Sequence, residues 1–406
     1  MNARWVKRGG LTPCVLLILC SYNIQMKITL PSDISQLLGG YSPQRFLQHY
    51  WHRKPLLIRN AIPGFKPVLA KSELFALAAS DDVESRLVAR VGRSWQLEHG
   101  PFSARTLRAA RLDPWTLLVQ GVNLHHDAAD RLFHRFDFIP MQRLDDLMVS
   151  YASDGGGVGP HFDSYDVFLL QAAGRRRWRI SMQEDRGLVR GAPLKILSRF
   201  RPEAEYVLEP GDMLYLPPGC AHDGVALGEC MTYSIGFRAP SAGELRRGLF
   251  EHLADGAHGE RMYEDPGLKP TSTPGMLDEQ YLARAARLIG RIQPTRDEVA
   301  CFLGCHLTEP KANVYFDLPR QTLPRAAFVR QAYAHGVALD RRTRMLYRGK
   351  QCFINGESVP NGADTAVIKD LADQRRLAPA TQIPRTALDL LYSWYTHGWI
   401  TAARAS

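Results

Sequence analysis

The sequence lacks the features of a disulfide-stabilised secreted protein. Its 406 residues include only seven cysteines, an odd number, and no two of them are spaced as CxxC. In a chain of this length, such sparse cysteines indicate free thiols in a reducing compartment and argue against a disulfide framework. Their spacing is also not that of a zinc finger. We therefore expect a cytoplasmic protein.

The sequence also has no apolar run long enough to cross a bilayer. The most apolar N-terminal stretch, residues 14–20, follows three basic residues and so resembles a short signal peptide, but no small-residue cleavage site comes after it. We interpret residues 1–25 as a mis-assigned start or an unstructured extension, with the globular chain beginning at Met26. A true export signal is the alternative, and no membrane partner is expected.

Internal repeats and low-complexity tracts are absent too, so the chain reads as an ordinary globular protein. Hydrophobic residues make up 45% and charged residues 23%, and the length allows two or three domains. The formal net charge is +10. That excess fits an acidic or nucleic-acid partner and fits equally well a basic soluble protein without one.

The pattern of predicted elements changes along the chain. Residues 26–110 mix short strands with helices, whereas 145–240 contain short strands separated by glycine and proline, which is typical of a barrel or sandwich. Helical periodicity follows, and a predicted hairpin over 344–354 among later helices resembles a winged helix. The strands predicted in the central segment are 147–153, 166–171, 176–180, 205–208, 212–216 and 231–237.

The first chemical motif is a glycine-rich segment that ends in His161-Phe-Asp163. Residues two apart on a strand point to the same face, so the imidazole of His161 and the carboxylate of Asp163 are expected on one side of the strand. They supply two of the three ligands of the facial triad that binds Fe(II) in non-haem oxygenases. The preceding glycines allow tight turns and leave space for a substrate.

The second motif is the segment 209–222, in which Gly211, Pro217, Gly219 and His222 have the spacing of the second cupin motif. We expect His222 to return to the barrel and complete the triad. A second metal-like group, residues 125–127, lies in a polar stretch without this context, and we interpret it as a loop. Two matched motifs make the set His161, Asp163 and His222 far more specific than a single histidine.

A co-substrate site is indicated by the basic segment 174–179. On a strand, Arg176 shares its face with Trp178, which makes it a half-buried cation that requires an anion. A guanidinium binds a carboxylate through two hydrogen bonds, so Arg176 is the candidate for the distal carboxylate of 2-oxoglutarate. An ion pair that closes the barrel is the alternative. Ser150 and Ser234 are further hydrogen-bonding candidates for this co-substrate.

These motifs resemble the bacterial JmjC-type ribosomal oxygenases, and in particular the branch that hydroxylates an arginine of a large-subunit ribosomal protein. The resemblance runs from about residue 26 to the C-terminus. It is carried by segments 55–59, 145–148, 155–168, 174–178 and 234–240.

The resemblance implies an α+β protein with a double-stranded β-helix. A cupin/JmjC barrel would occupy residues 26–240, a helical dimerisation region 241–300, and a winged-helix-like domain 301–406. A homodimer is implied as well.

The resemblance further implies Fe(II), 2-oxoglutarate and O2 as the cofactor and co-substrates. Iron would be bound at the triad and 2-oxoglutarate at Arg176. Ala152 departs from the family, where we expect a small polar residue. Asp154 and Tyr165 flank the first motif, and by position alone they are candidates for binding a substrate guanidinium.

The expected function is therefore hydroxylation of a ribosomal-protein arginine, with demethylation left open. A small-molecule cupin dioxygenase is one alternative, but it would not need 160 residues after the barrel. A non-enzymatic nucleic-acid-binding protein is another. The mixed charges over 363–377 argue against specific DNA binding.

Overall fold

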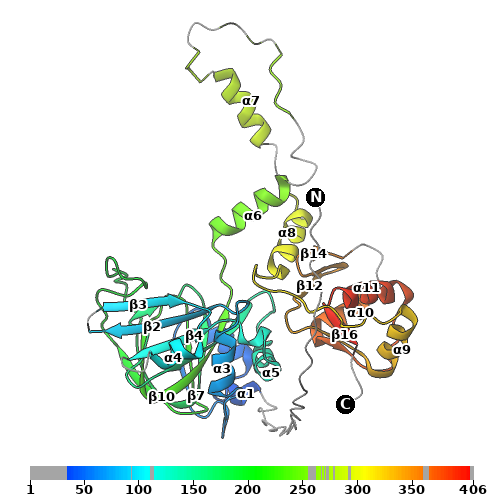
Figure 1. Ribbon diagram of the computed structural model, residues 1–406. Helices are drawn as coiled ribbons and strands as arrows, with labels where there is room; N and C mark the ends of the chain where they lie inside the picture. Colours follow the sequence, from blue (N-terminus) through cyan, green and yellow to red (C-terminus); the bar gives the residue numbers. More distant parts are fainter. Residues whose placement is uncertain are drawn as a thin grey trace, which may run out of the picture.

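The computed structural model shows a sheet-rich N-terminal domain and a smaller C-terminal domain, joined by a helical region (Figure 1). Within the described residues, no helix is long and apolar enough to cross a membrane. The structure describes residues 34–92, 94–109, 114–254, 262–266, 268, 270, 274–277, 279–290, 294–359 and 365–402. The N-terminal segment 1–25, and with it the expectation about the start of the chain, lies outside these residues.

The N-terminal domain is built on one ten-stranded sheet with the strand order β1-β9-β7-β10-β5-β4-β2-β3. Two long antiparallel strands, β7 and β10, run through its middle, with β8 paired to β7 and β6 paired to β10. This sheet agrees with the double-stranded β-helix that the resemblance implies. The strands are β1 (Leu56–Ile58), β2 (Ser85–Val91), β3 (Ser94–His99), β4 (Trp115–Val119), β5 (Leu144–Ala152), β6 (His161–Phe162), β7 (Val167–Ser181), β8 (Ala204–Leu208), β9 (Met213–Leu216) and β10 (Ala221–Phe237).

The main core lies between this sheet and the N-terminal helices. Phe46 of α2 contacts Phe168 of β7 and Tyr215 of β9, with ring centroids 5.4 and 4.9 Å apart. Large aromatic side chains bury much apolar area, so this cluster fixes the helices on the sheet. The elements outside the sheet are α1 (Ile34–Leu37), α2 (Pro43–His49), α3 (Lys71–Ala78), α4 (Ala104–Ala109), η2 (Val122–Leu124), α5 (Asp127–Phe133) and η3 (His134–Phe136).

The connecting region contains α6 (Ala242–Ala254), α7 (Glu279–Gly290) and α8 (Arg296–Thr308). The helical periodicity that follows residue 240 in the sequence is found here as helices. Helix α7 projects away from both domains (Figure 1). Helix α8 runs through residue 300, where the sequence suggests a domain boundary, and its Phe302 is buried.

The C-terminal domain combines three helices with two three-stranded sheets. Phe328 of α9 stacks on Tyr395 of α11 at 4.9 Å between ring centroids, and both belong to a separate apolar core. The predicted hairpin is confirmed as β12 and β13. The elements are α9 (Arg325–His335), β11 (Val337–Leu339), β12 (Met345–Arg348), β13 (Gln351–Ile354), β14 (Glu357–Ser358), α10 (Thr365–Gln374), β15 (Arg376–Leu377), α11 (Arg385–Thr396) and β16 (Ile400–Ala402).

Two expectations from the sequence differ from the structure. The strands predicted at 166–171 and 176–180 are one continuous strand, β7, because Gly174 adopts a positive φ of 61° and carries the chain through without a break. The segment 125–127 is a loop only in part: His125 lies in a turn and His126 between elements, whereas Asp127 begins α5. His126 caps α5, and its Nδ1 accepts a hydrogen bond from the backbone N–H of Ala129.

Candidate metal and co-substrate site

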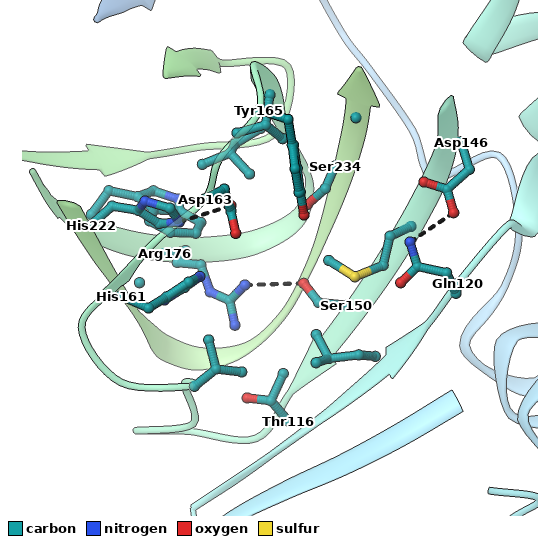
Figure 2. A pocket seen from close by; sticks show the side chains of 18 of the residues that line it. Thr116, Gln120, Asp146, Ser150, His161, Asp163, Tyr165, Arg176, His222 and Ser234 are labelled. Carbon is teal, nitrogen blue, oxygen red and sulfur yellow. Dashed lines mark hydrogen bonds and ion pairs between the residues drawn. The ribbon is translucent and has the colours of Figure 1, made fainter. Parts of the chain in front are cut away.

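The three predicted metal ligands meet inside the barrel. His161 on β6 is the register partner of His222 on β10, and their ring centroids lie 4.2 Å apart. Asp163 follows β6 directly, and its Oδ2 lies 3.7 Å from His222 Nε2. Potential ligand atoms of all three residues lie within 4.8 Å of one another, and this is the sole such group within the described part of the chain. Figure 2 shows their side chains grouped at one end of the cavity.

Backbone carbonyls orient both imidazoles. His161 Nδ1 lies 2.9 Å from the carbonyl oxygen of Gly159, and His222 Nδ1 lies 2.9 Å from that of Cys220. A carbonyl only accepts, so each Nδ1 carries the proton and each Nε2 is left with a free lone pair. Burial, reinforced by the neighbouring His161, lowers the pKa of His222 to about 4. The neutral imidazole, which is the form that ligates metals, therefore dominates near neutral pH.

Arg176 lies on the inner face of β7, as the alternation with Trp178 predicts, and both side chains are buried. Its Nη1 donates to Ser150 Oγ at 3.0 Å and to Thr232 Oγ1 at 3.3 Å. Asp223, whose charge also acts on Arg176, forms its own ion pair with Arg179 at 2.5 Å. Among the described residues, no carboxylate contacts Arg176, so the barrel-closing ion pair is not found.

Unpaired polar atoms surround this arginine. Arg176 Nε, Trp178 Nε1 and Thr116 Oγ1 are buried and have no hydrogen-bond partner within the described part of the chain. Burial alone lowers the pKa of Arg176, which measures how unfavourable an uncompensated charge is there. Buried donors and charges without partners are costly, so this end of the cavity is suited to a small anion such as a carboxylate.

A single cavity of about 120 Å³ joins the metal-ligand group to Arg176. Ser150, Ser234 and Tyr165 line it, so the structure brings these candidates together (Figure 2). Asp154 does not line it. The carboxylate of Asp154 is exposed and accepts a hydrogen bond of 2.7 Å from the backbone N–H of Gly228.

Asp146 and Thr116 are among the lining residues that the sequence reasoning missed. Asp146 could have been found, because on β5 it lies two and four positions before Met148 and Ser150 and therefore shares their face. Thr116 could not. It enters the cavity because β4 pairs with β5, where Thr116 stands opposite Ala152. The polar group expected at Ala152 is thus supplied by the neighbouring strand.

Two protein-family models match the two domains of the chain. Residues 131–245 match the JmjC domain, and residues 289–401 match the ROXA-like winged helix. A model of the AraC-like ligand binding domain also matches, over residues 199–309.

Two curated bacterial proteins are similar to this chain. Ribosomal protein uL16 3-hydroxylase of Escherichia coli is 39% identical over 247 residues, which are 60% of this chain and 65% of the relative, just under two thirds of its length. The probable ribosomal oxygenase of Haemophilus influenzae is 29% identical over 395 residues, covering 88% of this chain and 95% of the relative.

Solved structures agree along almost the whole chain. The X-ray structure of E. coli YcfD superposes with a TM-score of 0.77 at 29% identity and covers 89% of this chain and 98% of that one. A structure of the same ribosomal oxygenase in complex with cobalt and 2-oxoglutarate superposes with a TM-score of 0.73. Residues 131–245 and 289–401 therefore match a JmjC domain and a ROXA-like winged helix, and the chain resembles the bacterial ribosomal oxygenases along most of its length.

Proposed function

We propose that this chain is an Fe(II)- and 2-oxoglutarate-dependent dioxygenase that hydroxylates an arginine side chain of a large-subunit ribosomal protein. The observation that carries the proposal is one cavity lined both by two histidines and an aspartate and by a buried arginine that has no carboxylate partner among the described residues. The names of the two curated relatives point to the same class of reaction, oxidation of a ribosomal protein.

The donor set fits Fe(II). Two imidazoles and one carboxylate on one side of an ion leave coordination positions open for a bidentate co-substrate and for O2. When bound, the iron supplies the redox chemistry that activates O2 against a substrate C–H bond. His161, Asp163 and His222 would hold it, with the Nδ1 contacts to Gly159 and Cys220 fixing the rings.

The far end of the cavity fits the distal carboxylate of 2-oxoglutarate. Arg176 would bind this carboxylate, Ser150 keeps the guanidinium in place, and the unpaired hydroxyl of Thr116 can donate to the same anion. Over one cycle, one oxygen atom of O2 enters the substrate and the other enters succinate, while 2-oxoglutarate loses its carboxyl group as carbon dioxide.

The open part of the cavity fits a substrate cation. Asp146 is buried in its wall, and Tyr165 lies opposite Asp163 with its ring in the cavity (Figure 2). A carboxylate and an aromatic ring together recognise a guanidinium through charge-assisted hydrogen bonds and a cation–π contact. This pair supports the arginine assignment better than Asp154, which lies outside the cavity lining.

A homodimer is part of the proposal. Helix α7 exposes Leu282 and Ile289, one on each end of the same helix face, and Ile289 is 69% exposed. An apolar helix face that projects from the body is unfavourable in water, and pairing with a second copy would cover it.

The test measures succinate formation by the iron-loaded full chain, with and without purified ribosomal large-subunit proteins. We expect stimulation by one ribosomal protein and a mass gain of one oxygen atom on one of its arginines. Asp163→Ala should reduce both by more than about 100-fold, because even the loss of an outer hydrogen bond to a metal ligand costs 10–100-fold.

Turnover without that stimulation would keep the dioxygenase and reject the ribosomal substrate, which would favour the small-molecule cupin. Absence of both turnover and bound iron would reject the enzyme and favour a binding protein.

A further inference from the structure

Asp146 stands in a wall between two cavities. One is the cavity of the candidate site, and the other is a smaller cavity of about 40 Å³ at the junction with the C-terminal domain. Both are lined by Asp146 and by its neighbour Asp145. A side chain on the junction side can therefore act on the charge that the site presents to a substrate.

The two carboxylate oxygens of Asp146 face different sides of this wall. Oδ2 accepts hydrogen bonds from Gln120 Nε2 at 2.7 Å and from the backbone N–H of Gly121 at 3.0 Å, and Lys311 Nζ lies 3.8 Å from it. Oδ1 lies 3.7 Å from the position that a β-carbon on Gly236 would take. Because Gly236 and Tyr165 line the site cavity, Oδ1 is the oxygen that faces it.

Lys311 belongs to the segment 309–318, which connects α8 to the C-terminal domain and is hydrogen-bonded to both domains. Asn313 Nδ2 donates to the carbonyl of Asp82 in the barrel domain at 3.3 Å. Arg342 of the C-terminal domain donates to the carbonyl of Tyr315 and to the carboxylate of Asp317, each at 2.7 Å. The position of Lys311 against the barrel is thus set by both domains.

The charges around Asp146 make this lysine important. Asp145 is the adjacent negative group and lies 3.1 Å from Lys311 Nζ, while Arg238 Nε lies 3.7 Å from the same Asp145 oxygen. Arg344, which directly precedes β12, donates to backbone carbonyls there, and Tyr165 adds no charge at pH 7, since burial raises its pKa further above the ordinary value. Burial raises the pKa of Asp146 and Asp145 adds to this, whereas Lys311 opposes both.

We propose that Lys311 is a positioning residue that holds Asp146 charged and oriented, so that its free oxygen can receive the guanidinium of the substrate. The inference rests on the proposed function and adds to it a link from the winged-helix side of the molecule to substrate recognition. Lys311 contacts neither metal ligand nor Arg176 in its ion pairs, so its effect should be confined to the cationic substrate.

The test is binding of a fluorescein-labelled ribosomal-protein peptide with one arginine, and of the same peptide with citrulline in its place. Fluorescence anisotropy is measured on the full chain loaded with Co(II) and 2-oxoglutarate, so that no turnover consumes the peptide. We expect the unchanged chain to prefer arginine by about ten-fold, the size of one charge-assisted hydrogen bond.

Lys311→Met should weaken binding of the arginine peptide about five-fold, the scale of a partly exposed ion pair, and leave citrulline binding unchanged. Lys311→Arg should restore binding because it keeps the charge. Lys350→Met, in the exposed turn between β12 and β13, is the matched control and should change nothing. The KM for 2-oxoglutarate should stay constant in all three variants.

The inference would be overturned if Lys311→Met bound the arginine peptide as tightly as the parent chain does. Tighter binding would also overturn it, because Lys311 would then compete with the substrate for Asp146. If that variant keeps the arginine preference, the proposed function stands and only the role of Lys311 falls. If the unchanged chain fails to distinguish arginine from citrulline, the arginine assignment fails together with this inference.

Discussion

Single residues determine what this cavity can bind, through polar atoms that the fold buries without partners. Arg176 is the clearest case. Its guanidinium contacts two hydroxyls, those of Ser150 and Thr232, and its Nε has no partner among the described residues. A buried cation kept in this state is stable only if a ligand completes its contacts, which is why we assign it to the co-substrate and not to the scaffold.

At this scale we predict that Arg176→Met raises the KM for 2-oxoglutarate by at least about ten-fold, since a bidentate charged contact is lost. Arg176→Lys should give an intermediate KM, because a lysine keeps the charge but not the paired donors. The measurement is initial-rate kinetics of succinate formation, with thermal unfolding as the control for folding. A KM equal to that of the unchanged chain in both variants would place the co-substrate elsewhere.

Among the secondary-structure elements, the long strands β7 and β10 build the site and the helices α6 and α7 extend away from it. Strand β10 carries His222 near its start and Ser234 near its end, so one continuous strand spans the whole cavity. Helix α7 contacts the segment 262–266 through Tyr281 and Arg284, whereas its apolar residues Leu282 and Ile289 are exposed.

At the scale of this helix we predict that the chain is a dimer in solution and that Leu282→Asp combined with Ile289→Asp makes it a monomer. Two charges cannot be buried in an apolar interface without neutralisation, so pairing should be lost. Light scattering after size-exclusion chromatography gives the mass directly. Leu268→Asp, an exposed apolar residue outside α7, is the control. A monomeric unchanged chain would contradict the dimer.

The whole molecule is held together by arginines that reach from the C-terminal domain to the barrel. Arg344 donates to the carbonyls of Leu144 at 2.6 Å and of Met141 at 3.4 Å, and Arg341 donates to that of Leu124 at 2.7 Å. These carbonyls lie at the start of β5, just before it, or in η2, near Asp146. Docking of the second domain therefore stabilises the segment from which the cavity wall is built.

At this scale we predict that Arg344→Ala lowers the free energy of unfolding by about 2 kcal/mol, because hydrogen bonds from a charged donor are lost. Calorimetry should show the transitions of the two domains moving apart. Arg348→Ala, which removes the exposed ion pair with Asp297, should change stability by less than about 1 kcal/mol. Similar effects of the two substitutions would show that Arg344 does not join the domains.

Much of the site could be predicted from the sequence because its signals are local. His161 and Asp163 share a face through the alternation of a strand, and the spacing of glycine and proline before His222 marks the second motif. The inward position of Arg176 follows from the same alternation. The winged helix was indicated by its hairpin, which needs only a turn and two short apolar runs.

Asp154 shows where this reasoning stops. Asp154 is close to the motif along the chain. Gly155 next to it forms a turn with a φ of 70°, and the Asp154 carboxylate accepts a hydrogen bond from Gly228 outside the cavity lining. Which side of a loop faces a cavity depends on barrel closure, and closure is not encoded in any short segment.

The sequence by itself therefore determined the candidate ligand set, the inward-facing arginine and the class of fold, since strand periodicity and motif spacing are local geometry. Only the tertiary structure decided that Thr116 and Asp146 complete the cavity and that Lys311 stands behind Asp146. Those contacts join β4 to β5 and the barrel to the second domain. Contacts between residues so distant in the chain exist only once the sheet has closed and the domains have docked.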